Sequence, residues 1–214
     1  MRTLAHQYAD EYGYDIVLLD TSPSLGALNR NLLSLADGFL IPCSPDLFSV
    51  YGIRNIGNAL SVWRKQFESI FHFLSDSKRN QFPKKFVKFM GYTIYNAKKY
   101  SGSNNPLDLA VAQYSYAIQI PETINKFIDR ENMLTGCNSD LNQSIGGRAV
   151  IHTHNTLPNM AQKYHSPIWL LPDLSLEDED RPTITANREK YYSTRDAYAT
   201  FAKDFLDRMD CLHD

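Results

Sequence analysis

The chain has 214 residues, of which 43% are hydrophobic and 21% are charged, and its formal net charge is −2. These values are typical of a soluble domain with one hydrophobic core. No run of 18 apolar residues occurs and the first residues do not form a signal peptide, so we expect no membrane partner. The three cysteines, Cys43, Cys137 and Cys211, form no C-x-x-C motif. Their spacing argues against a zinc site and against a disulfide framework, and it favours a cytoplasmic location.

The first informative stretch follows a short helix that the sequence predicts over residues 3–12. Residues 16–19 are four consecutive apolar residues between Asp15 and Asp20, a pattern that predicts a buried parallel strand. Asp20 then lies at the carboxyl end of this strand, where open α/β sheets bind ligands. A carboxylate there can hold a metal-bound water beside a nucleotide phosphate. An Asp that only caps the next helix explains the residue equally well.

The next elements alternate between helix and strand. Helical stripes over residues 25–36 and 49–74 flank an apolar strand at 39–43, and Ser24 is a suitable N-cap for the first helix. A basic loop precedes a strand at 88–96. Further along we expect helices over 107–118 and from Pro121, an extended segment over 148–154, a strand over 167–171, and a last helix whose aromatic stripe packs in the core. This order predicts an α/β fold, a parallel sheet with helices on both faces, in a single domain over 1–214.

The stretch YDIVLLDTSPSLGALNRNLLSLADGFLIPCSPDLFSVYGIRNIG, residues 14–57, has a specific order of motifs. A strand is followed by a D-x-x-P-S turn, an L-G-x-L-x-x-N helix, a second strand and a P-D-x-x-S-x-x-G helix entry. This order resembles the ParA/MinD/Soj group of deviant-Walker P-loop ATPases, and a weaker match continues to the end of the chain. The resemblance implies an incomplete P-loop NTPase (Rossmann-like) fold, ATP and Mg²⁺ as ligands, a homodimer formed through the nucleotide face, and a switch that segregates DNA or another cargo.

The resemblance also implies roles for individual residues. Asp20 becomes the catalytic carboxylate and holds Mg²⁺ through a water. The switch that senses the γ-phosphate comprises Thr21, Ser22, Pro23 and Ser24. Asn96, Leu157 and Pro158 flank the adenine, although a turn role explains Asn96 nearly as well.

The phosphate-binding loop of that family has no counterpart here. The 214 residues contain no G-x-x-x-x-G-K-[ST] sequence, and Gly146-Gly147-Arg148 lacks both the lysine and the following helix. Backbone N–H groups of such a loop cradle the phosphates, so we expect the chain to bind ATP weakly and to be inactive alone. We interpret it as a domain truncated before the Walker B strand, completed by a missing N-terminal half or by a partner protein. The alternative is a non-catalytic protein-interaction module with the same fold.

Charge is distributed unevenly along the chain. Between residues 54 and 99 there are ten Lys and Arg against two acidic residues. A solvated face is the simpler interpretation, and a non-specific DNA contact is the alternative. The candidate DNA-binding residues are Lys84, Lys85, Lys88, Lys98 and Lys99, flanked by Phe82, Phe86 and Tyr100. We also expect a mobile acidic loop over about 174–183. His152 and His154 alternate on one face, but no third metal ligand accompanies them.

Overall fold

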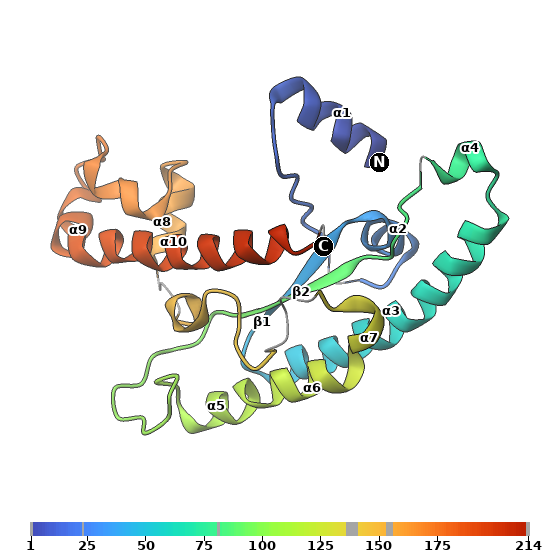
Figure 1. The fold of residues 1–214 in the computed structure, drawn as a ribbon. Helices are drawn as coiled ribbons and strands as arrows, with labels where there is room; N and C mark the ends of the chain where they lie inside the picture. Colours follow the sequence, from blue (N-terminus) through green and yellow to red (C-terminus); the bar gives the residue numbers. More distant parts are fainter. Residues whose placement is uncertain (1, 23, 81, 136–140, 153–155, 213–214) are drawn as a thin grey trace.

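The computed structural model describes residues 2–22, 24–80, 82–135, 141–152 and 156–212. At its centre is a parallel pair of strands, β1 (Gly38–Cys43) and β2 (Lys88–Ile94), surrounded by helices (Figure 1). The pairing runs from Gly38↔Lys88 to Cys43↔Ile94, with a bulge between Phe39 and Leu40. The predicted α/β class is confirmed in this coarse form, but the described residues form a sheet of only two strands and are mostly helical.

One face of the sheet packs against α3 (Leu47–Phe73) and, beyond it, α6 (Gln119–Phe127). The Asp46 side chain caps α3 by accepting from the Ser49 N–H, and the helix buries Ile53, Gly57, Leu60, Trp63 and Phe67. A side chain at Gly57 would lie 2.5 Å from the Phe127 carbonyl oxygen, so glycine allows α3 and α6 to approach closely. The short helices α5 (Val111–Ala117) and α7 (Arg130–Met133) flank α6.

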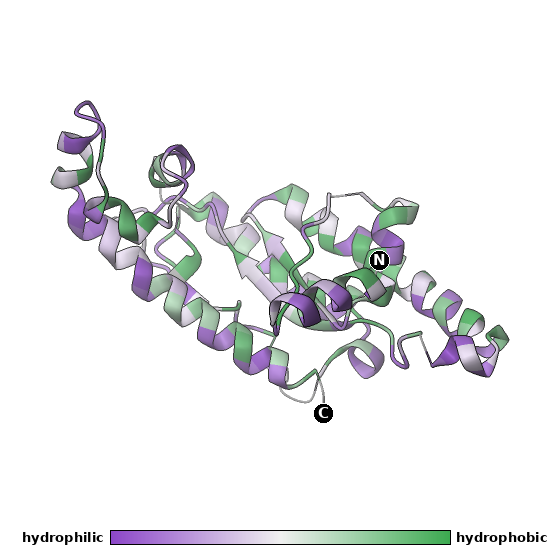
Figure 2. Cartoon of the chain, turned by 90° about the horizontal axis from the view of Figure 1, so that it is seen from above, coloured by the Kyte–Doolittle hydropathy of each residue, from purple (hydrophilic) through white to green (hydrophobic). Residues whose placement is uncertain are grey.

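The C-terminal part of α10 (Arg188–Asp210) reaches the sheet at β2, and hydrophobic and hydrophilic residues alternate along this helix (Figures 1 and 2). Arg208 of this helix donates to the Met90 carbonyl at 3.0 Å and to Asp204 at 2.7 Å. Asp204 in turn accepts from the Gly146 N–H at 2.8 Å. The first half of α10 forms a second cluster with α8 (Leu157–Lys163), α9 (Arg181–Ala186) and the 3₁₀ helix η2 (Ile168–Asp173).

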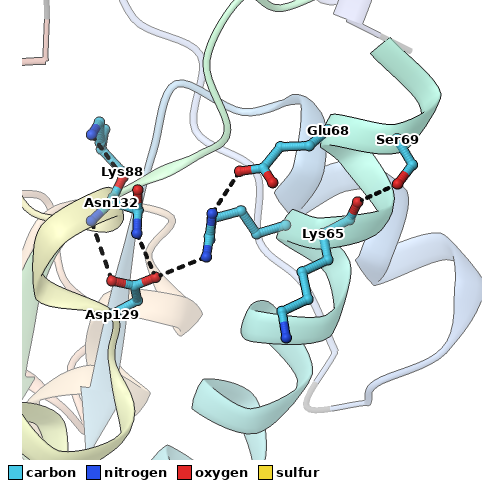
Figure 3. A network of polar contacts seen from close by, with 7 residues as sticks. Lys65, Glu68, Ser69, Lys88, Asp129 and Asn132 are labelled. Atoms are coloured by element: carbon cyan, nitrogen blue, oxygen red, sulfur yellow. Dashed lines mark hydrogen bonds and ion pairs between the residues drawn. The ribbon is translucent and has the colours of Figure 1, made fainter. Parts of the chain in front are cut away.

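A network of polar contacts joins α3, α7 and β2 (Figure 3). Arg64 contacts Glu68 at 2.6 Å and Asp129 at 3.2 Å, and Asp129 accepts from Asn132. Lys88 donates to the Asn132 carbonyl at 2.8 Å. Burial alone raises the pKa of Asp129, but its hydrogen bonds from Asn132 and the Arg64 charge outweigh burial and hold that pKa below its ordinary value.

The N-terminal region departs most from the sequence-based prediction. Helix α1 (Arg2–Tyr12) forms as expected and ends at Gly13, which has φ +67°, and α2 (Ala27–Leu35) follows. Residues 16–19, however, are extended but unpaired, and Leu18 is 76% exposed. The prediction of a buried strand here was wrong. A parallel strand obtains its hydrogen bonds only from neighbouring strands, and β1 and β2 pair with each other rather than with this segment.

The predicted strand at 167–171 was also wrong, and the segment predicted as extended over 148–154 begins as a helix. Residues 147–150 form a 3₁₀ helix, η1 (Gly147–Val150), because Gly146 and Gly147 both adopt left-handed backbone conformations and turn the chain. The apolar run at 167–171 lies in η2, where Ile168 and Leu171 bury the same face. A 3₁₀ helix places residues i and i+3 one above the other, which explains this pairing.

Smaller corrections concern caps, loops and cysteines. Gly26 rather than Ser24 precedes α2, Pro121 lies inside the first turn of α6, and the basic loop contains α4 (Asp76–Arg79). In the predicted acidic loop, Glu177 and Asp180 pair with Lys163 at 2.7 and 2.6 Å. Cys211 is disulfide-bonded, against expectation, whereas Cys43 is free and buried. Among the described helices, none combines the length and hydrophobicity needed to cross a bilayer.

Candidate functional site

A cavity of about 390 Å³ lies at the carboxyl end of β2, on the side of the sheet that faces α10. It brings together residues from β1, β2, η1, α8 and α10 that are far apart in the sequence. The lining residues are Leu40, Thr93, Tyr95, Asn96, Val150, His152, Pro158, Tyr198 and Phe201. Two of the three residues predicted to flank a base, Asn96 and Pro158, therefore lie in one cavity. The third, Leu157, packs against the second hydrophobic cluster instead.

Asn96 is positioned by an abrupt turn after β2. Its φ is +58°, a left-handed conformation that asparagine tolerates better than most residues. The next residue, Ala97, is fully buried and donates to the Ile151 carbonyl at 3.1 Å, which brings the segment carrying His152 beside it. His152 is itself held by a 2.9 Å hydrogen bond between Nε2 and the Leu107 carbonyl. His154, which the sequence places on the same face as His152, lies outside the described residues.

Three aromatic residues, Tyr95, Tyr198 and Phe201, line the cavity together with Asn96. Tyr198 packs against Trp169 with ring centroids 5.5 Å apart, and Phe201 stacks on Phe205 at 5.9 Å. Tyr95, which also lines the cavity, is 47% exposed. The sequence predicted the aromatic stripe of α10 as core only. A cavity with aromatic walls and a few amide and imidazole groups suits a flat heteroaromatic ligand.

The adjacent end of β1 offers no nucleophile. Burial, reinforced by the negative charge of Asp46, raises the pKa of the Cys43 thiol to about 12. A thiol with this pKa stays protonated at neutral pH and is inert.

The predicted catalytic and switch residues lie elsewhere. Asp20 is exposed at the end of the extended segment, and none of the described residues among 20–24 lines the cavity. The described part of the chain contains no cluster of three or more His, Cys, Asp or Glu side chains able to hold a metal ion. Pro23 lies outside the described residues.

Asn29 holds the switch segment, and sequence reasoning missed it. Its side-chain amide is 4% exposed and donates to the carbonyl oxygens of Ser22 and Ser24. The same nitrogen lies 3.3 Å from both serine hydroxyls. The available signal was an asparagine inside the apolar stripe of α2, one turn after the D-x-x-P-S turn. One buried amide therefore fixes the curvature of the turn.

The five candidate DNA-binding lysines fall into two groups. Lys84, Lys85 and Lys88 line a second cavity at the amino end of β2, whereas Lys98 and Lys99 lie beyond its carboxyl end. Seven residues of strand separate the groups by roughly 20 Å. Phe86 is buried and Phe82 packs on Phe67 at 4.9 Å, so of the three flanking aromatics only Tyr100 is exposed.

Comparison with known proteins connects the first part of the chain to one group. Residues 5–73 match the AAA domain family. A ParA family protein of Mycoplasma pneumoniae is 33% identical over 67 residues, which are 31% of this chain and 25% of that protein. The chromosome-partitioning ATPase Soj of Thermus thermophilus is 39% identical over 44 residues, which are 21% of this chain and 18% of that protein. No solved structure matches.

The aligned part of the chain spans about a quarter or less of the length of these relatives. The family match over residues 5–73 covers most of α1, the switch segment, α2, β1 and α3, and it includes Leu40 but ends before the other described residues that line the cavity. The order of motifs found in the sequence and the family match thus coincide over the same segment. Residues 5–73 therefore carry a match to the AAA domain family that is ParA/Soj-like, and over about 30% of its length or less the chain is similar to ParA-family proteins.

Proposed function

We propose that this chain is the base-binding part of a ParA-type positioning ATPase, in a system that segregates DNA or another cargo. The observation that carries the proposal is the cavity in which Asn96 and Pro158 meet. The family resemblance assigns both residues to the adenine. In parallel α/β sheets the ligand cleft lies at the carboxyl ends of the strands, and this cavity is at that end of β2.

The residues fit the base of ATP better than they fit its phosphates. Asn96 can donate to and accept from a base edge, and the ring of Tyr95 can stack on its face. For the phosphates and Mg²⁺ the described residues provide no comparable set, because Asp20 is exposed and outside the cavity. The sequence also has no G-x-x-x-x-G-K-[ST] loop. We therefore expect base binding by this chain, weak ATP binding, and ATP hydrolysis no faster than background.

Asp20 and the switch segment keep their assigned roles only in an assembly that supplies the phosphate loop. There, Asp20 would hold the Mg²⁺-bound water and residues 21–24 would respond to the γ-phosphate. Asn29 supports this proposal because it already holds Ser22 and Ser24 in a defined turn. Because Asp20 is exposed, replacing it with alanine should leave the folded chain intact.

Adenosine binding tests the proposal. Full-length chain is titrated with adenosine by calorimetry, and the Tyr95→Ala variant is compared with Tyr100→Ala as a matched control. Both tyrosines are exposed and follow closely on β2, but only Tyr95 lines the cavity. Base stacking on an aromatic ring contributes about 1–3 kcal/mol, so Tyr95→Ala should weaken adenosine binding by about tenfold.

An absence of saturable adenosine binding, or equal losses in the two variants, would overturn the base-binding proposal. The second candidate function, a non-catalytic protein-interaction module, would then be favoured. It has its own supporting observation in α1, where Leu4, Tyr8 and Tyr12 are all more than half exposed and none of the helix is buried.

A further inference from the structure

A second cavity, of about 190 Å³, lies at the amino end of the sheet, opposite to the candidate base site. Four cationic side chains line it: Arg2 from α1, Lys84 and Lys85 from the loop before β2, and Lys88 from the first position of β2. Phe86, Pro83 and Leu212 provide apolar walls. One water occupies about 30 Å³ of liquid, so the space accommodates a small anion with a few waters.

The positive charges in this cavity are poorly compensated. Asp37 is the single acidic residue among the described lining residues, and Arg2 already pairs with it at 2.7 Å. Lys84 and Lys85 are exposed and form no ion pair with any described residue. Lys88 uses one of its N–H groups on the Asn132 carbonyl and has two left.

The charge of Lys85 acts on its neighbour Lys88 in this cavity. Burial first, and then the neighbouring positive charge of Lys85, lower the pKa of the Lys88 ammonium, while Asp129 acts in the opposite direction and does not outweigh them. Like charges held together in this way favour a bound anion over an empty cavity, because the anion removes their mutual repulsion.

We propose that the cavity lined by Lys84, Lys85 and Lys88 binds an oxyanion of the phosphate type. Lys84, Lys85 and Lys88 come from two adjacent segments and line the same cavity, so their ammonium groups can serve as point-charge donors to the oxygens of one bound phosphate. The apolar walls limit competing water at the back of the cavity. The site is distinct from the base cavity, which lies at the other end of β2. Its ligand is either a free phosphate or one phosphate of a nucleic acid backbone.

Titration with inorganic phosphate tests the site. Full-length chain in low-salt chloride buffer, without nucleotide, is titrated by calorimetry alongside a Lys84→Gln/Lys85→Gln variant. The matched control is Lys98→Gln/Lys99→Gln, which removes the same charge near the other end of β2. We expect saturable binding by the parent chain and the control, and at least about tenfold weaker binding by the first variant, because hydrogen bonds to charged groups are lost.

A Lys84→Arg/Lys85→Arg variant separates charge from folding, because it keeps both cations and should keep phosphate binding. The proposal is overturned if the parent chain shows no saturation, or if the two glutamine variants lose binding equally. Random-sequence duplex DNA, added as a competitor, identifies the source of the phosphate. Displacement of phosphate that weakens steeply with salt indicates a DNA backbone, whereas failure to compete indicates a free phosphate. Because no adenosine is present, failure here leaves the base-binding proposal unaffected.

Discussion

The two ends of β2 present opposite chemistry on the same strand. At its carboxyl end, Asn96, His152 and aromatic residues line a cavity, and none of its described lining residues is Asp, Glu, Lys or Arg. At its amino end, four cationic side chains line a cavity with one acidic residue. The first environment favours a flat, uncharged group and the second a compact anion.

This difference follows from how the sheet is built. Six of the seven positions of β2 are buried, so most of its side chains pack in the core, and its residues that line the two cavities lie near its ends, Lys88 at the start and Thr93 one position before the last. The chain changes direction where the strand starts and stops, and there polar side chains are free to gather. A two-stranded sheet with helices on both faces can therefore carry two separate sites, provided that one core holds both ends in place.

The largest expected loss of stability comes from a substitution in the hydrophobic core that holds both ends of β2. Leu60 is fully buried on α3 in the cluster that includes Phe39 and Phe89. Leu60→Ala should lower the free energy of unfolding by about 2–5 kcal/mol, because it removes buried methyl groups and leaves a cavity. Chemical denaturation measures this change. Val62→Ala, on the exposed face of the same helix, is the control and should cost much less. Similar losses for both variants would contradict the assignment of this core.

A smaller effect is expected at Asn96, where two variants distinguish its role in the turn from its role in base binding. Its left-handed backbone is strained for alanine by about 1–2 kcal/mol, and glycine relieves that strain. Asn96→Ala should therefore lower the thermal midpoint, whereas Asn96→Gly should preserve it. If the amide binds a base, adenosine affinity should fall in both variants. Unchanged affinity in Asn96→Gly would show that the residue serves only the turn.

The smallest effect should appear at the amino end. Lys85→Gln removes a charge that repels Lys88. In the absence of any anion it should therefore raise the free energy of unfolding by well under about 1 kcal/mol, which appears as a slightly higher thermal midpoint. The gain should vanish at high salt because exposed charges are screened. Lys98→Gln provides the comparison and should have no such effect. A fall in stability on Lys85→Gln would mean that its charge is compensated in the folded chain.

Long periodic patterns predicted the fold where they occur. Helix α3 repeats its apolar residues over 27 positions, and β1 and β2 are apolar runs bounded by polar turns, so the sequence specifies each of them. The family resemblance assigned Asn96, Leu157 and Pro158 to the adenine, which stays a prediction; Asn96 and Pro158 line one cavity and Leu157 packs in the second hydrophobic cluster.

Short apolar runs alone did not predict strands correctly. Residues 16–19 and 168–171 have the same apolar character as β1, yet the first is unpaired and the second is a 3₁₀ helix. Strand pairing depends on which neighbours are present, and the sequence of a single run does not contain that information. The cationic cavity was only partly predictable, because Arg2 reaches it from α1 through the pairing with Asp37, 35 residues away. Charge counting found the lysines but not their separation into two groups.

The comparison of adenosine with ATP tests the central claim most directly. The measurement uses calorimetry on the Lys84→Gln/Lys85→Gln variant, so that the amino-end cavity does not contribute to phosphate binding. If the carboxyl-end cavity holds the base and the chain provides no phosphate clamp there, adenosine and ATP with Mg²⁺ should bind with dissociation constants within roughly a factor of three, a difference below about 1 kcal/mol. Micromolar binding of ATP with Mg²⁺, together with no saturable binding of adenosine, would contradict this account.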